Sequence, residues 1–341
     1  MNMNTKTLNI ELDNTENSSA YLLERMVAEV HKVCGLTLKK DISTVSRRLS
    51  ALPAGWHFNG DDTAAIPIGP HAEGGYQLLA IEGMQGSLVS KQPWFAGWCS
   101  VMVNCSDIAA MGGRPTAVVD ALWADGDSFL VSEVLRGMRD ASESLGVPIV
   151  GGHTNLRSRS PNLAVSILGH ANRLLSSFAA KPGQLLVMAV DLRGAFHGEG
   201  FNWNAATNAP PERLREDLAI LPYVADQQLA YACKDISQAG LLGTIVMMLE
   251  SSQCGAVVDL DVIPKPQSAP MLDWLCAFPS FGYVMTTSHK KLSLLRETFE
   301  KRDIHFAVIG EITDDKQLWT TKGQQRCLFY DLQIAELTGF T

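Results

Sequence analysis

The sequence predicts an α+β protein, built from α/β layers in both halves of the chain. Segments 19–35 and 128–145 repeat apolar residues at helical spacing, whereas 76–81 and 185–190 are short apolar runs of strand length. Turn-forming residues separate the two kinds of segment along the sequence. With 341 residues, the chain is long enough for two domains.

Local residues justify the elements of the first half in order. Gly35 follows the first helical segment and is a suitable stop for it. Pro93 suits the first turn of a helix, where its missing N–H is not needed, and Gly112 ends that helix. Gly146 ends the next one. The predicted helices are 19–35, 41–52, 93–110 and 128–145, and the predicted strands are 76–81, 116–123, 147–150 and 163–170.

The second half follows a turn at 181–183 and starts with the strand 185–190. A stretch rich in Gly, Asn and Pro comes next, at 194–211. It is either a loop whose aromatic residues close over a substrate or a solvated surface loop. The other predicted helices are 211–218, 222–233, 241–252, 270–277 and 290–302. The other predicted strands are 257–262, 283–287 and 306–312, and a strand that runs into a loop is predicted at 234–240. The predicted divisions of the chain are an N-terminal tail with helices (1–50), a first domain (51–172) and a second domain (173–341).

Composition argues against several classes of function. The net charge of −8 disfavours non-specific binding to nucleic acid or anionic membranes. The chain has no apolar run of about 18 residues, and residues 1–17 lack the basic and apolar regions of a signal peptide. Seven cysteines without a Cys-x-x-Cys spacing favour reduced, buried thiols, and Cys105 is expected to be one of these. We therefore expect a cytoplasmic protein that binds neither nucleic acid nor membrane.

Asp61 and Asp62 are adjacent carboxylates between Gly60 and a small, apolar run. Adjacent carboxylates repel each other, so a fold that holds them together needs a cation or hydrogen-bond donors. Oxygen ligands of this kind suit Mg²⁺, which often bridges carboxylates and nucleotide phosphates. The alternative is a solvated turn, in which paired aspartates are common.

Asn104 and Asp107 lie three residues apart on the predicted helix 93–110, so their side chains face the same way. The apolar neighbours Val103 and Ile108 argue against a fully solvated carboxylate. An amide and a carboxylate on one helix face are suitable oxygen ligands for a metal ion shared with Asp62. The alternative is a surface hydrogen bond.

Two further motifs lie at 150–155 (VGGHTN) and 235–242 (DISQAGLL). Gly151 and Gly152 would let the backbone approach a phosphate closely. Imidazole is a poor ligand for Mg²⁺, so His153 is expected to donate a hydrogen bond to a phosphate or to orient a carboxylate ligand. The alternative for His153 is a packed histidine in the core.

The motifs at 60–66, 103–115, 150–155 and 235–242 resemble, in order and spacing, those of the AIR synthase (PurM-like) superfamily of ATP-using enzymes. The chain is similar to thiamin-monophosphate kinase and selenophosphate synthetase, and most similar to an uncharacterised AIR synthase-related branch. The resemblance implies a PurM-like two-domain fold with a C-terminal α/β domain. In its N-terminal ATP-binding domain, the sheets of two copies would pair into a barrel, which makes the protein a homodimer.

The resemblance also implies a site for ATP and Mg²⁺. The metal ligands would be Asp62, Glu82, Asp107 and Asp235, and the catalytic residues would be Asp62, Asp107 and His153. The residues that bind the cofactor would be Asp61, Asn104, Gly151, Gly152, Thr154, Asp235 and Ser237. The implied protein is a Mg²⁺-dependent kinase or a synthetase (ligase) that phosphorylates or activates a small-molecule substrate through an oxygen nucleophile.

The chain departs from the kinase pattern at several positions. Where the kinases have Ser-Thr-Asp, this chain has Glu82, Gly83 and Met84. His153 and Gln238 also replace acidic residues of the kinases. A different substrate is one interpretation of these departures. The alternative is a catalytically degenerate protein that binds nucleotide, or only a partner, and regulates.

Overall fold

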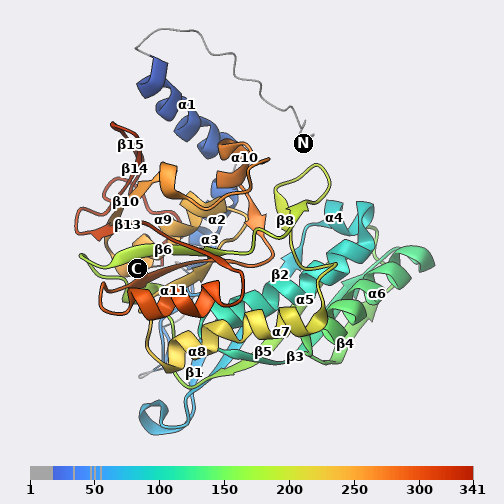
Figure 1. The fold of residues 1–341 in the computed structure, drawn as a ribbon. Coiled ribbons are helices and arrows are strands. Elements are labelled where there is room, and N and C mark those ends of the chain that lie inside the picture. The colour runs from blue at the N-terminus through green and yellow to red at the C-terminus, as the bar shows by residue number, and fades with distance from the viewer. Residues whose placement is uncertain (1–17, 34, 47, 50, 54–55, 341) are drawn as a thin grey trace. The chain divides into compact units, whose positions relative to one another are not determined.

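The computed structural model describes residues 18–33, 35–46, 48–49, 51–53 and 56–340, which form two compact units (Figure 1). Unit 1 comprises the N-terminal segment to Leu49 with Ser177–Ala205 and Ile236–Thr341. Unit 2 comprises Ser50–Ser176 with Ala206–Asp235. Residues 206–235 therefore belong to the same unit as most of the predicted first domain. The predicted N-terminal tail, at 1–17, lies outside the described residues.

Unit 2 is built on a mixed sheet with the strand order β1-β2-β5-β3-β4. All neighbouring pairs in it are antiparallel except β3 and β4, which are parallel. Its strands are β1 (Ala64–Pro67), β2 (Tyr76–Met84), β3 (Arg114–Trp123), β4 (Ile149–Asn155) and β5 (Asn162–Ala171).

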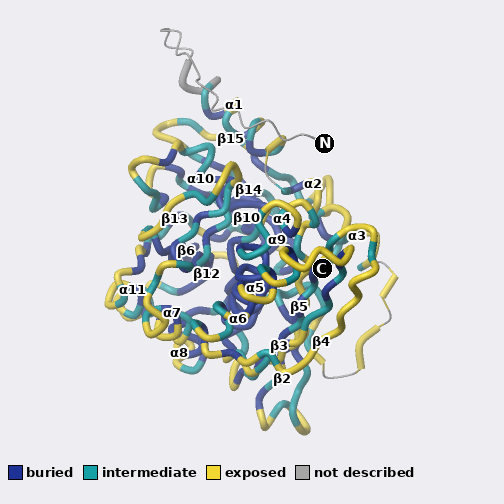
Figure 2. The backbone as a smooth tube through the Cα atoms, turned by 90° about the vertical axis from the view of Figure 1, so that its right-hand side faces the viewer, coloured by how far each residue is buried: buried dark blue, intermediate teal, exposed yellow. Residues whose placement is uncertain are grey.

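The central helix of unit 2 is α5 (Pro93–Ala110), which packs against β2, β3 and β5. Every residue from Phe95 to Ala110 is buried, and Figure 2 shows this burial along the α5 backbone. A helix that is apolar on all sides suits such a position. The polar residues of α5 are therefore held inside the protein.

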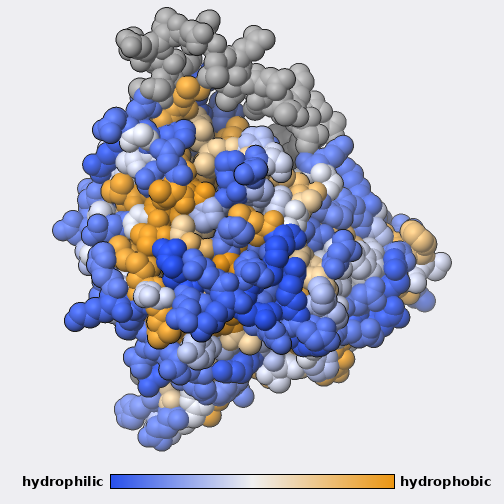
Figure 3. Space-filling model, in the orientation of Figure 1, coloured by the Kyte–Doolittle hydropathy of each residue, from blue (hydrophilic) through white to orange (hydrophobic). Residues whose placement is uncertain are grey.

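The amphipathic helix α6 (Ser128–Leu145) covers α5 and presents its polar side outward. The region over α6 and α7 (Pro211–Leu218) is mainly hydrophilic in Figure 3. Unit 2 is completed by α4 (Gly86–Lys91), α8 (Ile220–Asp226) and β9 (Cys233–Asp235), of which β9 packs against α5.

In unit 1, six strands lie in the order β15-β14-β10-β13-β6-β12. Every residue of β6 and β12 is buried, as is typical of strands covered on both faces. The strands are β6 (Leu185–Val190), β10 (Gly255–Asp259), β12 (Gly282–Thr287), β13 (His305–Thr313), β14 (Gln317–Lys322) and β15 (Gln325–Asp331). A small sheet has the order β11-β8-β7, with β7 (Ala195–Phe196), β8 (Asn202–Asn204) and β11 (Phe278–Pro279). The helices are α1 (Ser18–Val33), α2 (Leu36–Lys40), α3 (Ile42–Ser46), α9 (Gly240–Ser252), α10 (Met271–Leu275) and α11 (Leu292–Glu300).

Elements with a clear start and stop signal agree best with the sequence predictions. The predicted helices 93–110, 128–145 and 211–218 and the predicted strand 185–190 are confirmed at both ends. The prediction of one helix over 222–233 is wrong, because α8 ends at Asp226 and β9 follows. Helices α2 and α4 and strands β1, β7, β8, β11, β14 and β15 were not predicted from the sequence.

The cysteines follow the prediction in part. Cys99, Cys105, Cys233, Cys254 and Cys327 are free thiols, and all but Cys327 are buried. Burial raises the pKa of the Cys105 thiol, which fits a packing role better than that of a nucleophile. Cys276 differs from the prediction because it is disulfide-bonded.

The contact between α5 and α6 requires glycine at two positions. A Cβ at Gly137 would lie 1.9 Å from the carbonyl oxygen of Trp94, and a Cβ at Gly97 would lie 2.1 Å from that of Val134. Both obstacles are backbone atoms, which cannot rotate away. The position of α5, and of the polar residues that it carries, therefore depends on these glycines.

We predict that Gly137→Ala lowers the free energy of unfolding by about 1–3 kcal/mol, because the added methyl group forces α6 away from α5. Urea unfolding monitored by tryptophan fluorescence measures the change. Gly83→Ala is the matched control, since a Cβ at that position meets no atom within 4 Å. Equal stability of the two variants would contradict the proposed role of the glycine contact.

Candidate functional site

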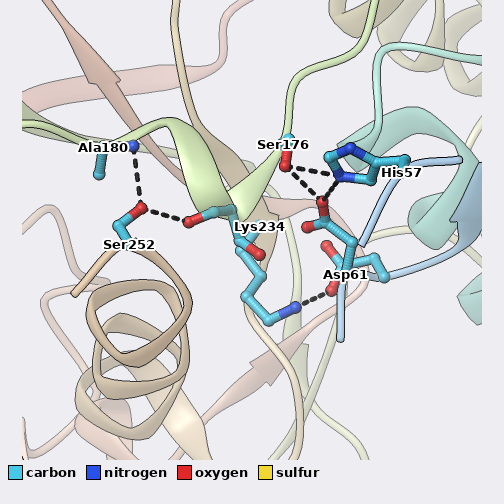
Figure 4. Close-up of polar contacts among 8 residues, drawn as sticks. His57, Asp61, Ser176, Ala180, Lys234 and Ser252 are labelled. Atoms are coloured by element: carbon cyan, nitrogen blue, oxygen red, sulfur yellow. Dashed lines mark hydrogen bonds and ion pairs between the residues drawn. The ribbon is translucent and has the colours of Figure 1, made fainter. Parts of the chain in front are cut away.

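Asp61 and Asp62 lie in unit 2, just before β1, and have different partners. Asp61 Oδ2 accepts a hydrogen bond from Ser176 Oγ at 2.6 Å and lies 2.9 Å from His57 Nε2. Ser176 Oγ is also 2.9 Å from the same His57 nitrogen. Figure 4 shows these three side chains pointing toward one another.

The group of Asp61, His57 and Ser176 contains the residue types of a serine-hydrolase triad but not its geometry. In a triad, the carboxylate and the hydroxyl contact opposite nitrogens of the imidazole ring, so that the ring can pass on a proton. Here both contact Nε2. These hydrogen bonds hold the buried Asp61 in place, and they leave Asp62 as the carboxylate available for other contacts.

Asp62 forms an ion pair with Lys234 of β9. The Lys234 ammonium donates to Asp62 Oδ1, and the backbone N–H of Asp235 donates to Asp62 Oδ2 at 3.3 Å. Figure 4 shows the Lys234 side chain extending toward the chain segment that carries Asp61. Both members are buried, with side chains 7% and 5% exposed. Burial raises the pKa of Asp62, and the Lys234 charge opposes that rise. Burial by itself would lower the pKa of Lys234, but the charges of Asp62 and Asp61 outweigh it and raise that pKa.

Asn104 and Asp107 lie on α5, three residues apart as predicted, and both are buried. The Asn104 amide nitrogen donates to the carbonyl oxygens of Ser100 at 2.7 Å and Val165 at 3.0 Å. Asn104 Oδ1 and Asp107 Oδ2 are buried and have no hydrogen-bond partner in the structure. Buried polar atoms normally have a partner, so two unpaired oxygens on one helix point to a missing cation or donor.

The charges around Asp107 identify the other members of the site. Burial raises the pKa of Asp107 well above its usual value, and the negative charges of Asp235, Glu82 and Asp62 raise it further. Lys234 acts in the opposite direction. Asp62, Glu82 and Asp235 therefore lie near enough to Asp107 for their charges to act on it. With Asp107, they are the four residues predicted as metal ligands.

A row across the sheet adds a carboxylate that the sequence analysis missed. In strand register, Glu82 is opposite Val165, Val165 is opposite Asp120, and Asp120 is opposite Gly152. A Cβ at Gly152 would lie 2.2 Å from Asp120 Oδ1, so only glycine leaves room for this carboxylate. Burial raises the pKa of Asp120. Its signal in the sequence is a carboxylate in the middle of the apolar strand 116–123.

The structure does not bring His153 to this row. Side chains alternate along a strand, so His153 lies on the opposite face of β4 from the position of Gly152. His153 is opposite Ala121 in register, and its ring centroid is 6.4 Å from that of Trp123. Thr154 is opposite Leu122, on the same face as Gly152. His153 is exposed, so it is not a packed histidine of the core in this chain either.

Ser237 and Gln238 belong to unit 1. The Ser237 backbone N–H donates to Thr244 Oγ1 at 3.2 Å, and its side-chain oxygen is buried without a hydrogen-bond partner. The carbonyl oxygen of Gln238 accepts a hydrogen bond from Gly35 at 3.1 Å.

Part of the stretch 194–211 has a role that neither of the two sequence alternatives included, while its residues 198–200 are exposed. It contains the hairpin of β7 and β8, whose Trp203 is buried. The indole N–H of Trp203 donates to the carbonyl oxygen of Asp191 at 2.9 Å. The ring packs edge-to-face against Phe196 at 5.3 Å and Trp274 at 5.2 Å. This part of the stretch therefore contributes to the aromatic core of unit 1.

The donor atoms of the carboxylate cluster fit Mg²⁺ in one particular way. Among the described residues, no group of three or more His, Cys, Asp or Glu side chains is arranged so that it could hold a metal ion by itself. Mg²⁺ does not need one, because it keeps several waters and takes phosphate oxygens as further ligands. The unpaired oxygens of Asp107 and Asn104 are hard donors of the required kind.

Fold and site together define a two-unit α+β protein with a cluster of carboxylates around α5, of which Asp107 and Asp235 are buried and Glu82 is exposed. Its sequence matches AIR synthase related protein, N-terminal domain, over residues 60–171, and AIR synthase related protein, C-terminal domain, over residues 182–320. A protein of Synechocystis sp., itself described as uncharacterised, is 41% identical over 94% of this chain and 99% of its own length. The chain belongs to the AIR synthase related protein family.

Solved structures share this fold, as the resemblance implied. Thermotoga maritima PurL complexed with ATP has a TM-score of 0.67 and 21% identity, over 86% of this chain and 48% of PurL. The present chain thus spans about half the length of PurL. A ThiL structure complexed with AMPPCP and TMP has a TM-score of 0.62 and 18% identity, over 85% of this chain and 95% of ThiL. Within the described residues, no helix has both the length and the apolar character needed to cross a membrane.

We predict that Ser176→Ala lowers the free energy of unfolding by roughly 1–3 kcal/mol, because the buried Asp61 carboxylate loses a donor. Thermal unfolding measures the difference. Ser144→Ala is the control, since that hydroxyl donates only to a backbone carbonyl within its own helix. If Ser176→Ala destabilises the protein no more than Ser144→Ala does, Ser176 does not anchor Asp61.

Proposed function

We propose that this protein is a Mg²⁺-dependent, ATP-using enzyme that phosphorylates or activates a small molecule through an oxygen nucleophile. The observation that carries the proposal is the pair of buried, unpaired oxygens on α5, Asp107 Oδ2 and Asn104 Oδ1. They lie among carboxylates whose mutual repulsion a divalent ion would relieve.

The relatives support ATP as the nucleotide. PurL of Thermotoga maritima has been solved with ATP, with ADP and with AMPPCP, and ThiL with AMPPCP and TMP. Selenide, water dikinase of Myxococcus xanthus is 27% identical over 54% of this chain. These proteins act on different substrates, so they support the use of ATP without identifying the acceptor.

In the proposed site, Asp107 and Asn104 hold the metal from α5, with Glu82 and Asp235 nearby and Asp62 held by Lys234. When bound, Mg²⁺ would neutralise charge on the phosphates and fix their geometry. Gly151, Gly152 and Thr154 of β4 remain candidates for contacts with phosphate. The chain's own contribution is to hold Asn104, Asp107 and Asp235 in a buried, low-dielectric environment.

A second candidate function is a degenerate member that binds nucleotide and regulates. Met84 occupies the end of β2 where kinases supply an acid, and His153 lies on the far face of β4 from Asp120. Both observations reduce the number of groups that can reach a phosphate. Turnover of ATP by the purified protein, offered candidate acceptors with Mg²⁺, separates the two functions.

We also propose that the protein is a homodimer and that it is cytoplasmic. An exposed apolar surface supports the homodimer. Leu79 and Ile81 of β2, Val119 of β3 and Leu168 of β5 are exposed on the sheet of unit 2. Leu79 and Leu168 are directly opposite in register, so the apolar side chains adjoin. They alternate with residues that face α5. Exposed patches of this kind mark interfaces, and a second copy of the sheet would cover this one.

We predict that Asp107→Asn weakens Mg²⁺·ATP binding by about 1–3 kcal/mol in calorimetry, because it removes a charge-assisted contact and keeps the shape. His153→Asn is measured beside it. If His153 contacts phosphate, as the sequence analysis expected, both variants lose affinity. If His153 on the far face of β4 does not contact phosphate, only Asp107→Asn loses affinity for Mg²⁺·ATP. ATP affinity that survives Asp107→Asn unchanged in a folded protein would refute the metal site.

We also predict that Ile81→Lys converts the dimer to a monomer, because Ile81 is 68% exposed on the apolar sheet surface and a charge there would be buried on association. Light scattering at micromolar concentration gives the mass. Phe129→Lys is the matched control, as Phe129 is 70% exposed but lies on α6. A wild-type protein that is monomeric at this concentration rules out the dimer.

A further inference from the structure

Two acids of the carboxylate cluster in unit 2, Asp62 and Asp107, differ in their hydrogen-bond partners. Both oxygens of Asp62 are occupied, Oδ1 by the Lys234 ammonium and Oδ2 by the Asp235 backbone N–H. Asp107, in contrast, has a buried oxygen with no partner. One acid thus has a cation supplied by the chain, and the other is left open.

Lys234 is fixed where it is by its surroundings. It lies in β9, a three-residue strand that is buried throughout and packs against α5. Its neighbour Asp235 is also buried, so the backbone places a cation and an anion side by side at one edge of the cluster. A buried ammonium needs an anion within reach, and Asp62 supplies it.

We propose that the Lys234 ammonium occupies the place of a second divalent cation at Asp62, so that the site takes a single divalent ion, at Asp107 and Asn104. The inference rests on the proposed function only for the identity of that remaining ion. A tethered ammonium satisfies a carboxylate at any magnesium concentration, whereas a divalent ion leaves when its concentration falls. Lys234 therefore sets the number of metal ions.

The test counts metal ions without using ATP or activity. Mn²⁺, read by electron paramagnetic resonance and calorimetry, stands in for Mg²⁺. Wild type is expected to bind about one Mn²⁺ per chain. Lys234→Met removes the ammonium and keeps the length of the side chain, and it is expected to bind about two. Its thermal unfolding temperature should rise with Mn²⁺ more than that of wild type, because the freed Asp62 gains a partner.

Two controls isolate the contact. Lys234→Met combined with Asp62→Asn removes both partners and should return the count to that of wild type. Lys322→Met breaks the exposed ion pair with Asp261, which has an N–O distance of 2.6 Å, and should gain no metal site. Lys234→Gln provides a second folded variant if Lys234→Met is too unstable to purify.

The outcomes separate this proposal from the proposed function. If folded Lys234→Met and Lys234→Gln bind no more Mn²⁺ than wild type, the proposed role of Lys234 is overturned. If both variants are unfolded, the role is overturned when added Mn²⁺ does not restore the fold. A loss of ATP affinity in those variants at an unchanged count would instead make Lys234 a ligand of phosphate. If wild type binds no Mn²⁺ but Lys234→Met binds one, the proposed metal site at Asp107 fails while the role of Lys234 stands.

Discussion

The site depends on the burial of a helix that carries polar groups. Helix α5 is enclosed from Phe95 to Ala110, and most of its surface is apolar, so the fold gains from burying it. Asn104 and Asp107 are buried with it, and their oxygens lose water without gaining donors. The apolar residues of α5 thereby hold two strong oxygen acceptors in an environment that favours a cation.

The adjacent acids show how the protein manages charge inside unit 2. Asp61 is held by hydrogen bonds with Ser176 and His57, and so serves the structure. Asp62 is held by the charge of Lys234 and faces the cluster. Two residues of the same type, one peptide bond apart, thus have separate tasks because their side chains meet different neighbours. The repulsion between the two carboxylates is offset by the hydrogen bonds at Asp61 and by the positive charge of Lys234 at Asp62.

Sequence reasoning identified what local signals encode. Pro93 and Gly112 delimit α5, and the spacing of Asn104 and Asp107 placed both on one face of it. The acids from four separate segments were found through a family resemblance, since nothing local shows that Glu82 and Asp235 approach Asp107. Lys234 and Asp120 were missed because their importance arises from pairing across the fold. The far-face position of His153 depends on strand register, which a motif does not reveal.

Gly152 of β4 and Asp120 of β3 depend on each other across the two paired strands. The carboxylate of Asp120 fills the space in which a side chain at 152 would start, so the second glycine of this motif accommodates a neighbouring strand, whatever ligand it also contacts. A designer who moved the motif onto another sheet would have to move the facing residue of β3 too. Conversely, exchanging Asp120 for alanine would not free position 152, because the backbone carbonyl oxygen of Asp120 would still lie 2.9 Å from a Cβ there. The backbone of β3, and not only its side chain, therefore requires glycine at 152.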